Sequence, residues 1–500
     1  MSAFINRRAV GRGVGRGVSR VLAGWGLAGA CATSAFAQPF DRAPLPGPPR
    51  PFEIAAPVEQ RLANGLRVVL AERRGVGLVT AQLVVLSGSE TDPAQRAGLA
   101  SITAGLLTKG TRQHSASALA RAAESLGSAL DSGAGWHQSE VSMTVAAPHL
   151  DAALRLIAEA VREPTFDATE LERLRVQTLD DLKVAYARPG TVASLAAQRL
   201  AFGAGAYGLP ASGTTASLPR IARRDLLDLH AAHYRPDNAV LLFAGDLDAA
   251  AALRLAERRF GDWRPARAPV PAPAASAYAG APLSVPGAII EMPQAGQAAV
   301  VLVLPVPPLG AERAAAAVMN AVLGGGYSSR INQEIRIKRG LSYSAGSQLD
   351  ARREGGALRL VVQTKNESAS EVAALLNAEL DRLVAEPVGA AELAARKAAL
   401  IGGFSRGVET TAGLAATVKS LIVAGLPTAD LPRRIDALMA VSAADVQRYA
   451  AAHLGAARRR LAVAGDSGQF SAALNASGTP LVVVPVTRLD LERPDALTAP

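Results

Sequence analysis

The chain has 500 residues, of which 49% are hydrophobic and 19% charged, and its formal net charge is +10. This length exceeds what one ordinary hydrophobic core serves, so it predicts more than one domain. Five arginines and no acidic residue lie in the segment 1–37, so the remainder carries only about +5, which argues against a nucleic-acid-binding protein. The only cysteine is Cys31, which excludes disulfides and thiolate metal sites from the rest of the chain.

The segment 1–37 has the pattern of an export signal. The five arginines precede an apolar run over 21–35, and Ala35-Phe36-Ala37 fits the small-x-small cleavage rule. We therefore expect that the signal is cleaved between Ala37 and Gln38 and that the protein is located in the periplasm. An arginine-rich mitochondrial presequence is the alternative, and the compact apolar block favours export. No large aliphatic residue stands where a lipobox needs one before Cys31, so a lipid anchor is not expected.

Two proline-rich stretches divide the remaining chain. One directly follows the signal, and the other, rich in proline and alanine, separates two halves of similar size. No apolar run after the signal-like segment is long enough to span a membrane. The predicted segments are a signal peptide (1–37), a Pro-rich arm (38–57), a first lobe (58–264), a linker (265–286), a second lobe (287–467) and a C-terminal tail (468–500).

The two halves repeat the same order of elements. Strand-like runs at 66–70 and 79–86 open the first half. Glu163-Pro164 recurs as Glu386-Pro387, and the helical pattern that begins at Leu171 recurs from Leu393 with nearly the same offset. A repeat of this length is a duplicated domain, so we expect an α+β fold with two homologous lobes, each a mixed or antiparallel sheet with helices packed on it. The other repeated features are a strand before a helix (141–146 before 150–161; 358–363 before 369–383) and a closing Gly-Asp (Gly245-Asp246; Gly465-Asp466).

Four motifs in a fixed order connect the chain to a known family. They are Asn64-Gly65-Leu66-Arg67-Val68, the helix from Gly98 to Thr111 with its G-L-A…K-G-T frame, Tyr234-Arg235-Pro236-Asp237-Asn238-Ala239, and Gly324-Gly325-Gly326-Tyr327-Ser328-Ser329-Arg330. With these motifs the chain resembles the insulinase/pitrilysin-type zinc metallopeptidases over roughly residues 57–467. The resemblance implies that the two lobes form half of a clam-shell chamber that closes over an unfolded peptide.

The chain departs from this family at the zinc site. In the family, two histidines one helical turn apart bind zinc, the glutamate before the second activates water, and a further glutamate ligand follows on a later helix. Here Ser101 and Gly105 stand in place of the histidines, Ala104 in place of the general base, and Asp181 at the position of the later ligand. Zinc needs three protein ligands with imidazole or carboxylate donors, so the resemblance implies no bound metal and no activity for this chain alone.

A second family motif is retained. Arg336 and Tyr343 are seven residues apart, as in the R-x-x-x-x-x-x-Y segment with which the family contacts substrate near the zinc. The resemblance implies a non-catalytic, substrate-binding subunit of a heterodimeric zinc metallopeptidase. Its partner would be a homologous H-x-x-E-H subunit that holds the zinc, and its own Gly324, Gly325 and Gly326 would contact the backbone of the unfolded peptide substrate.

Three alternatives remain at this point. An inert scaffold or a peptide-binding or assembly protein of the same fold is the first, and the retained Arg336 and Tyr343 argue against a pure scaffold. Ser405 lies in a G-x-S-x-G sequence, but it interrupts a helical pattern, whereas a nucleophile elbow needs a strand before it. His230 and His233 have an i, i+3 spacing that suits metal, and their position beside the Tyr234 motif favours packing instead.

Overall fold

The computed structural model describes residues 53–271, 280–308, 310–476 and 481–497. The predicted signal peptide and most of the Pro-rich arm therefore lie outside the described residues, and so does part of the predicted linker. Within the described ranges, no helix is long and apolar enough to cross a membrane.

The first half folds around a six-stranded sheet with the order β1-β2-β6-β3-β5-β4. β2 pairs with β6 in parallel, and the other neighbours are antiparallel. In β5 buried and half-buried residues alternate, which places Val141, Met143 and Val145 on the core side. The elements are β1 (Val58–Arg61), β2 (Arg67–Glu72), β3 (Leu78–Val85), α1 (Leu99–Leu106), α2 (Ala116–Glu124), β4 (Asp131–Ala134), β5 (Ser139–Ala146), α3 (Leu150–Arg162), α4 (Ala168–Tyr186), α5 (Pro189–Phe202), α6 (Arg223–His233), β6 (Ala239–Gly245) and α7 (Ala249–Phe260).

The second half repeats this sheet. Its order is β12-β7-β11-β8-β10-β9, so β7, β11, β8, β10 and β9 take the places of β2, β6, β3, β5 and β4. The expectation of an α+β fold with two homologous lobes is confirmed. The elements are β7 (Gly287–Glu291), β8 (Ala298–Val306), α9 (Arg313–Leu323), a π-helix (Asn332–Lys338), β9 (Ala345–Arg352), β10 (Gly355–Thr364), α10 (Ala369–Ala385), α11 (Ala390–Gly407), α12 (Thr411–Val423), α13 (Arg434–Ala440), α14 (Ala443–His453), β11 (Arg460–Gly465), α15 (Ser471–Ala476) and β12 (Val482–Pro485).

The segment predicted as a C-terminal tail contributes a strand. β12 pairs in parallel with β7 over Val482–Pro485. The β-branched run Val482-Val483-Val484 favours a strand, and it covers an edge of the second sheet that β7 would otherwise leave unpaired. At the same position of the first sheet stands β1, from the beginning of the described chain.

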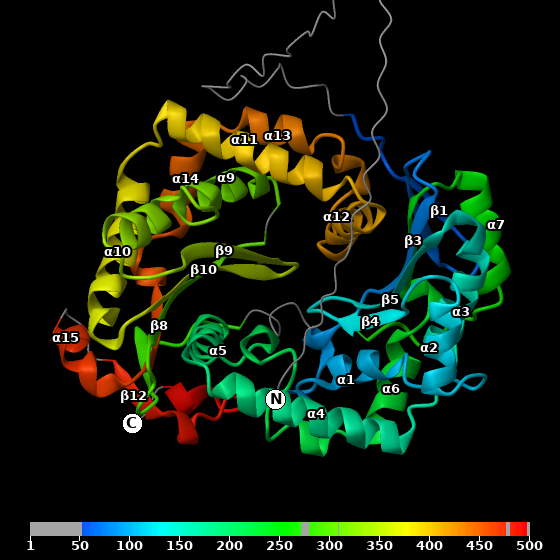
Figure 1. Cartoon of the computed structure of the whole chain (residues 1–500), viewed down its shortest axis with the longest axis horizontal. Helices are drawn as coiled ribbons and strands as arrows, with labels where there is room; N and C mark the ends of the chain where they lie inside the picture. The colour runs from blue at the N-terminus through cyan, green and yellow to red at the C-terminus, as the bar shows by residue number, and fades with distance from the viewer. Residues whose placement is uncertain (1–52, 272–279, 309, 477–480, 498–500) are drawn as a thin grey trace, which may run out of the picture. The chain divides into compact units, whose positions relative to one another are not determined.

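Each half also covers one face of the other half's sheet. Helix α5, from the first half, packs Val192, Ala196 and Leu200 against the second sheet, including Ile290 and Val301. Helix α12, from the second half, packs Leu414 and Val418 against Val69, Val240 and Leu242 of the first sheet. Figure 1 shows α5 beside β8 and α12 beside β3. This exchange explains why β6 is buried on both faces along its whole length.

Candidate functional site

Helix α1 carries Ser101, Ala104 and Gly105, which the resemblance aligns with the zinc motif of the family. Ser101 and Gly105 are half-buried on one side of the helix, and Ala104 is fully buried in the core. A Cβ atom at Gly105 would lie 3.0 Å from Leu174 Cδ2 of α4. An aliphatic side chain of α4 therefore packs directly against the position where the second histidine would stand, and no donor atom replaces the imidazole.

Asp181 does not complete a metal site. It is exposed on α4 and lies seven residues from Leu174, which is about 10 Å along a helix axis. Among the described residues, no group of three or more His, Cys, Asp or Glu side chains is placed to hold a metal ion. The residues at the zinc position of this chain therefore do not fit zinc, because they offer one carboxylate where three converging ligands are needed.

Asp92 fixes the beginning of α1. Its carboxyl oxygens accept hydrogen bonds from the backbone N–H groups of Gly98 and Ala100, both at 2.9 Å. Gly98 has a left-handed φ of 92°, which lets the chain turn into the helix. Burial, with a smaller contribution from the nearby Glu90, raises the pKa of Asp92 to about 8, against the lowering effect of the backbone N–H donors. Asp92 and Gly98 together thus determine where helix α1 begins in the fold.

The glycine loop after α9 is buried at both ends and exposed in its middle. Gly324 is buried, and a Cβ atom there would lie 2.3 Å from the backbone nitrogen of Ser347, which donates to the Gly324 carbonyl at 3.0 Å. Gly325 and Gly326 are exposed. At the end of the motif, the buried Arg330 forms an ion pair of 2.9 Å with Glu392 of α11. Both ends of the loop are therefore held by contacts within the fold, whereas Gly325 and Gly326 expose their main-chain groups to solvent.

Arg336 lies on the π-helix that follows this loop. Ile331, before the π-helix, and Ile335, within it, are fully buried and anchor this segment in the core. The Arg336 guanidinium carbon lies 5.1 Å from the centre of the Tyr327 ring, a cation–π contact. In the described part of the chain Arg336 forms no ion pair, so its charge is free to meet a ligand. π-helical turns are rare and are found disproportionately at functional sites.

Tyr343 lies in the short loop between the π-helix and β9. The loop is held by Ser342, whose hydroxyl donates to the Ser344 carbonyl at 2.7 Å, and by Thr364, which donates to the Leu341 carbonyl at 2.7 Å. The Tyr343 side chain itself is 90% exposed. Its phenol therefore projects from an ordered loop into solvent, where it contributes nothing to the core.

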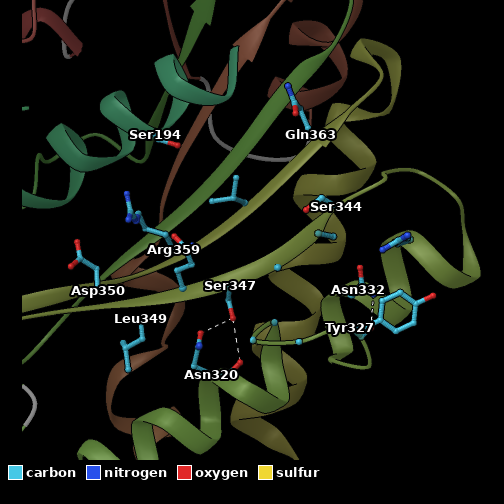
Figure 2. Close-up of a pocket in the computed structure, with 18 of the residues that line it drawn as sticks. Ser194, Asn320, Tyr327, Asn332, Ser344, Ser347, Leu349, Asp350, Arg359 and Gln363 are labelled. Atoms are coloured by element: carbon cyan, nitrogen blue, oxygen red, sulfur yellow. Dashed lines mark hydrogen bonds between the residues drawn. The ribbon is translucent and has the colours of Figure 1, made fainter. Parts of the chain in front are cut away.

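A cavity of about 1240 Å³ joins several of the predicted residues. Arg336 and all three glycines line it, whereas Tyr343 does not. Figure 2 shows the side chains around this cavity, with Tyr327 at one side and with Ser347 hydrogen bonded to Asn320. The lining residues that sequence reasoning missed are mostly polar: Ser194, Asn320, Asn332, Ser344, Ser347, Gln348, Asp350, Arg359 and Gln363.

One signal for these missed residues was present in the sequence. Arg359 and Gln363 alternate with the buried Leu358, Leu360 and Val362 along β10, so the polar positions share one face of the strand. The neutral amides and hydroxyls from β9, α5 and α9 carried no such signal, because they meet only in the folded chain.

The comparisons with known proteins agree with this geometry. Residues 67–215 match the family described as "Insulinase (Peptidase family M16)", and residues 220–400 match the "Peptidase M16 inactive domain". The chain belongs to the insulinase-type (M16) peptidase family. The match to the first description contains helix α1, and the match to the second contains the glycine loop, Arg336 and Tyr343.

Relatives of the M16 family in several bacteria are similar along most of their length. An uncharacterized zinc protease of Mycobacterium tuberculosis is 28% identical over 369 residues, which cover 73% of this chain and 83% of the relative. The β subunit of the rat mitochondrial-processing peptidase is 27% identical over 201 residues, 40% of this chain and 41% of that subunit.

Two solved structures have the same fold. A peptidase M16 inactive domain from Pseudomonas fluorescens superposes with a TM-score of 0.75 at 26% identity, covering 82% of this chain and 98% of that one. A protease from Helicobacter pylori gives a TM-score of 0.76 at 18% identity, with coverages of 83% and 100%; this similarity concerns the fold alone.

The remaining candidates from the sequence have structural roles. Ser405 lies inside α11, as its helical pattern predicted, and not on the strand-to-helix turn of a nucleophile elbow. His230 Nε2 hydrogen bonds the Val161 carbonyl at 2.7 Å, and burial lowers its pKa. His233 Nδ1 lies 2.9 Å from the Ser87 hydroxyl, and burial lowers its pKa as well. Both histidines of this M16 protein are thus engaged in packing.

Proposed function

We propose that this chain is the non-catalytic, substrate-binding subunit of an exported heterodimeric zinc peptidase that degrades unfolded peptides. The proposal depends on the contrast between two parts of the chain: a cavity suited to binding a peptide and a helix α1 without catalytic residues. Arg336, with no ion pair in the described chain, and the bare backbone of Gly325 and Gly326 line a large polar cavity. Helix α1, by contrast, presents an alanine, a serine and a glycine in place of the catalytic residues.

The chemistry of Arg336 and Tyr343 suits peptide hydrolysis at a site completed by another subunit. A tetrahedral intermediate develops negative charge on the former carbonyl oxygen, and a phenol hydroxyl or a guanidinium can donate to that oxygen or to nearby peptide carbonyls. Tyr343 is available for this role because it is 90% exposed, and Arg336 because no carboxylate within the described residues neutralises it.

The cavity suits a peptide of unspecified sequence. Its neutral side chains, including Asn320, Asn332, Gln348 and Gln363, can donate to and accept from main-chain amides. Strand β4 also ends the first sheet with no further strand beside it in the described chain. Such an edge offers main-chain hydrogen bonds to an extended peptide irrespective of its side chains. Both features favour an unfolded peptide as substrate.

The partner in this proposal is a homologous chain with an intact H-x-x-E-H motif, which holds the zinc. The names of the relatives support this reading, since several are zinc proteases and one is a subunit of a processing peptidase. The arginine-rich signal pattern over 1–37 supports a periplasmic location. An inert scaffold of the same fold is the rival function.

The test is cleavage of a quenched fluorescent peptide library. This chain alone, a genomically adjacent H-x-x-E-H homologue alone and their mixture are compared, each with and without a chelator. We expect activity only in the mixture, abolished by the chelator. Chelator-sensitive activity of this chain alone would contradict the assignment of α1 as a lost zinc site. No activity in any sample would favour the scaffold.

A further inference from the structure

A second cavity, of about 550 Å³, lies in the second half of the chain among α9, α11, α12, α13 and the end of β9. Its walls are largely aliphatic and come from all five elements. The apolar side chains that matter here are Ala314, Ala317, Leu349, Leu400, Leu421 and Leu438. A volume of this size lies within the range of small-molecule sites, which are typically apolar cavities with a few placed polar groups.

The charged groups of this cavity all have one sign. Four arginines line it, and no Asp or Glu does. Two of them have acidic partners at its border: Arg313 pairs with Asp430 at 2.8 Å and Arg352 with Asp350 at 2.6 Å. The other two, Arg353 and Arg434, form no ion pair with any described residue. The cavity therefore carries uncompensated positive charge beside aliphatic walls.

The two arginines without an ion pair are held in place by other contacts. The Arg353 guanidinium donates to the carbonyl of Val423 at the end of α12, at 3.2 and 3.3 Å. The Arg434 guanidinium carbon lies 5.4 Å from the centre of the Phe404 ring. Desolvation and the neighbouring Arg313 lower the pKa of Arg434, although the residue remains exposed to solvent. An anion placed between these groups would relieve the repulsion between Arg313 and Arg434.

We propose that this cavity binds an organic anion with a hydrocarbon body, of the long-chain carboxylate class. The carboxylate would accept hydrogen bonds from Arg353 and Arg434, and the chain would lie against the leucines and alanines. Among the lining side chains only Asn320 and Ser420 are polar and uncharged, so a peptide or a sugar would leave most of its polar groups unpaired in the cavity. The absence of acidic lining residues disfavours a cation.

Binding of decanoate to the purified chain tests this inference by calorimetry, independently of any peptidase activity. Decanoate should bind, whereas acetate, which lacks the hydrocarbon body, and decyltrimethylammonium, which has the opposite charge, should not. Arg434→Gln and Arg353→Gln should each weaken binding about tenfold or more, as expected for losing a hydrogen bond to a charged group. Arg433→Gln is the matched control, because Arg433 is the adjacent arginine, exposed like Arg434, and does not line the cavity.

The opposite results would overturn the proposal. Equal binding of decanoate and decyltrimethylammonium would show a nonspecific apolar surface, and unchanged affinity of the Arg434→Gln variant would show that the anion lies elsewhere. Tighter binding of an apolar peptide with a free C-terminus than of decanoate would refute the ligand class. Ala317→Phe, which fills the cavity from α9, should abolish decanoate binding while far-ultraviolet circular dichroism stays unchanged.

Discussion

Arg352, at the end of β9, joins the two halves of the chain through an aromatic box. Its guanidinium carbon lies 4.1 Å from the ring centre of Trp136 and 4.7 Å from those of Phe202 and Tyr207, all from the first half. It also pairs with Asp350 at 2.6 Å, and its side chain is only 3% exposed. We predict that Arg352→Met, which removes the charge but retains much of the apolar volume, destabilises the folded chain.

The magnitude follows from these contacts. A desolvated cation–π interaction contributes about 2 kcal/mol, and breaking a buried ion pair by removing one partner costs about 3–5 kcal/mol. The second figure must be reduced here because Asp350 is 24% exposed and can recover part of its hydration. We therefore expect Arg352→Met to lower the free energy of unfolding by about 2–4 kcal/mol. Arg352→Lys should fall between this variant and the wild type, since an ammonium cannot stack as a planar group.

Urea unfolding followed by tryptophan fluorescence measures this effect. Of the three tryptophans, Trp25 lies in the predicted signal segment, so Trp136 in the box and Trp263 report on the processed chain. The control is Arg448→Gln, which removes an exposed i, i+3 pair with Asp445 and should change stability by less than about 0.5 kcal/mol. If Arg352→Met also stays within about 0.5 kcal/mol of the wild type, the box does not stabilise the junction of the two halves.

Three further predictions concern the site. Tyr343→Phe should lower turnover by the mixed subunits about 100-fold and leave assembly, measured by gel filtration, unchanged; unaltered turnover would refute the role of the hydroxyl. Gly324→Ala should destabilise the chain by about 1–3 kcal/mol in urea because its Cβ would lie 2.3 Å from the Ser347 nitrogen, whereas Gly326→Ala, with open space around it, is the neutral control. Burial holds the pKa of Asp92 at about 8, against about 3.9 in an unfolded chain, so the folded state keeps a proton that the unfolded state loses. The free energy of unfolding should therefore fall as pH rises from 5 to 7, by roughly 1 kcal/mol per unit from this group, and Asp92→Asn should remove that slope; an identical slope in the variant would contradict it.

Local patterns predicted most of the elements. The helical pattern from Leu171 forms α4, and the pattern from Leu393 forms α11. The strand expected over 141–146 forms β5. The spacing of the repeated elements predicted two homologous lobes, and the sheet orders agree. These features depend on side-chain periodicity and on duplication, both of which can be recognised in a single sequence. The residues at the aligned positions of α1, Ser101, Ala104 and Gly105, are likewise read from the sequence alone.

Other features required the folded chain. The exchange of α5 and α12 between the sheets and the pairing of β12 with β7 join segments that are far apart in sequence. The polar cavity gathers neutral side chains from α5, α9, β9 and β10, and the aromatic box around Arg352 draws on three segments of the first half. The sequence by itself marked Arg336, Tyr343 and the three glycines as candidates for contact with a peptide, and it missed most of the polar side chains that line the cavity. Only the tertiary structure decided which side chains lie together in one cavity. Contacts between segments that are far apart in sequence, and the burial that these segments share, produce no periodic pattern in the chain.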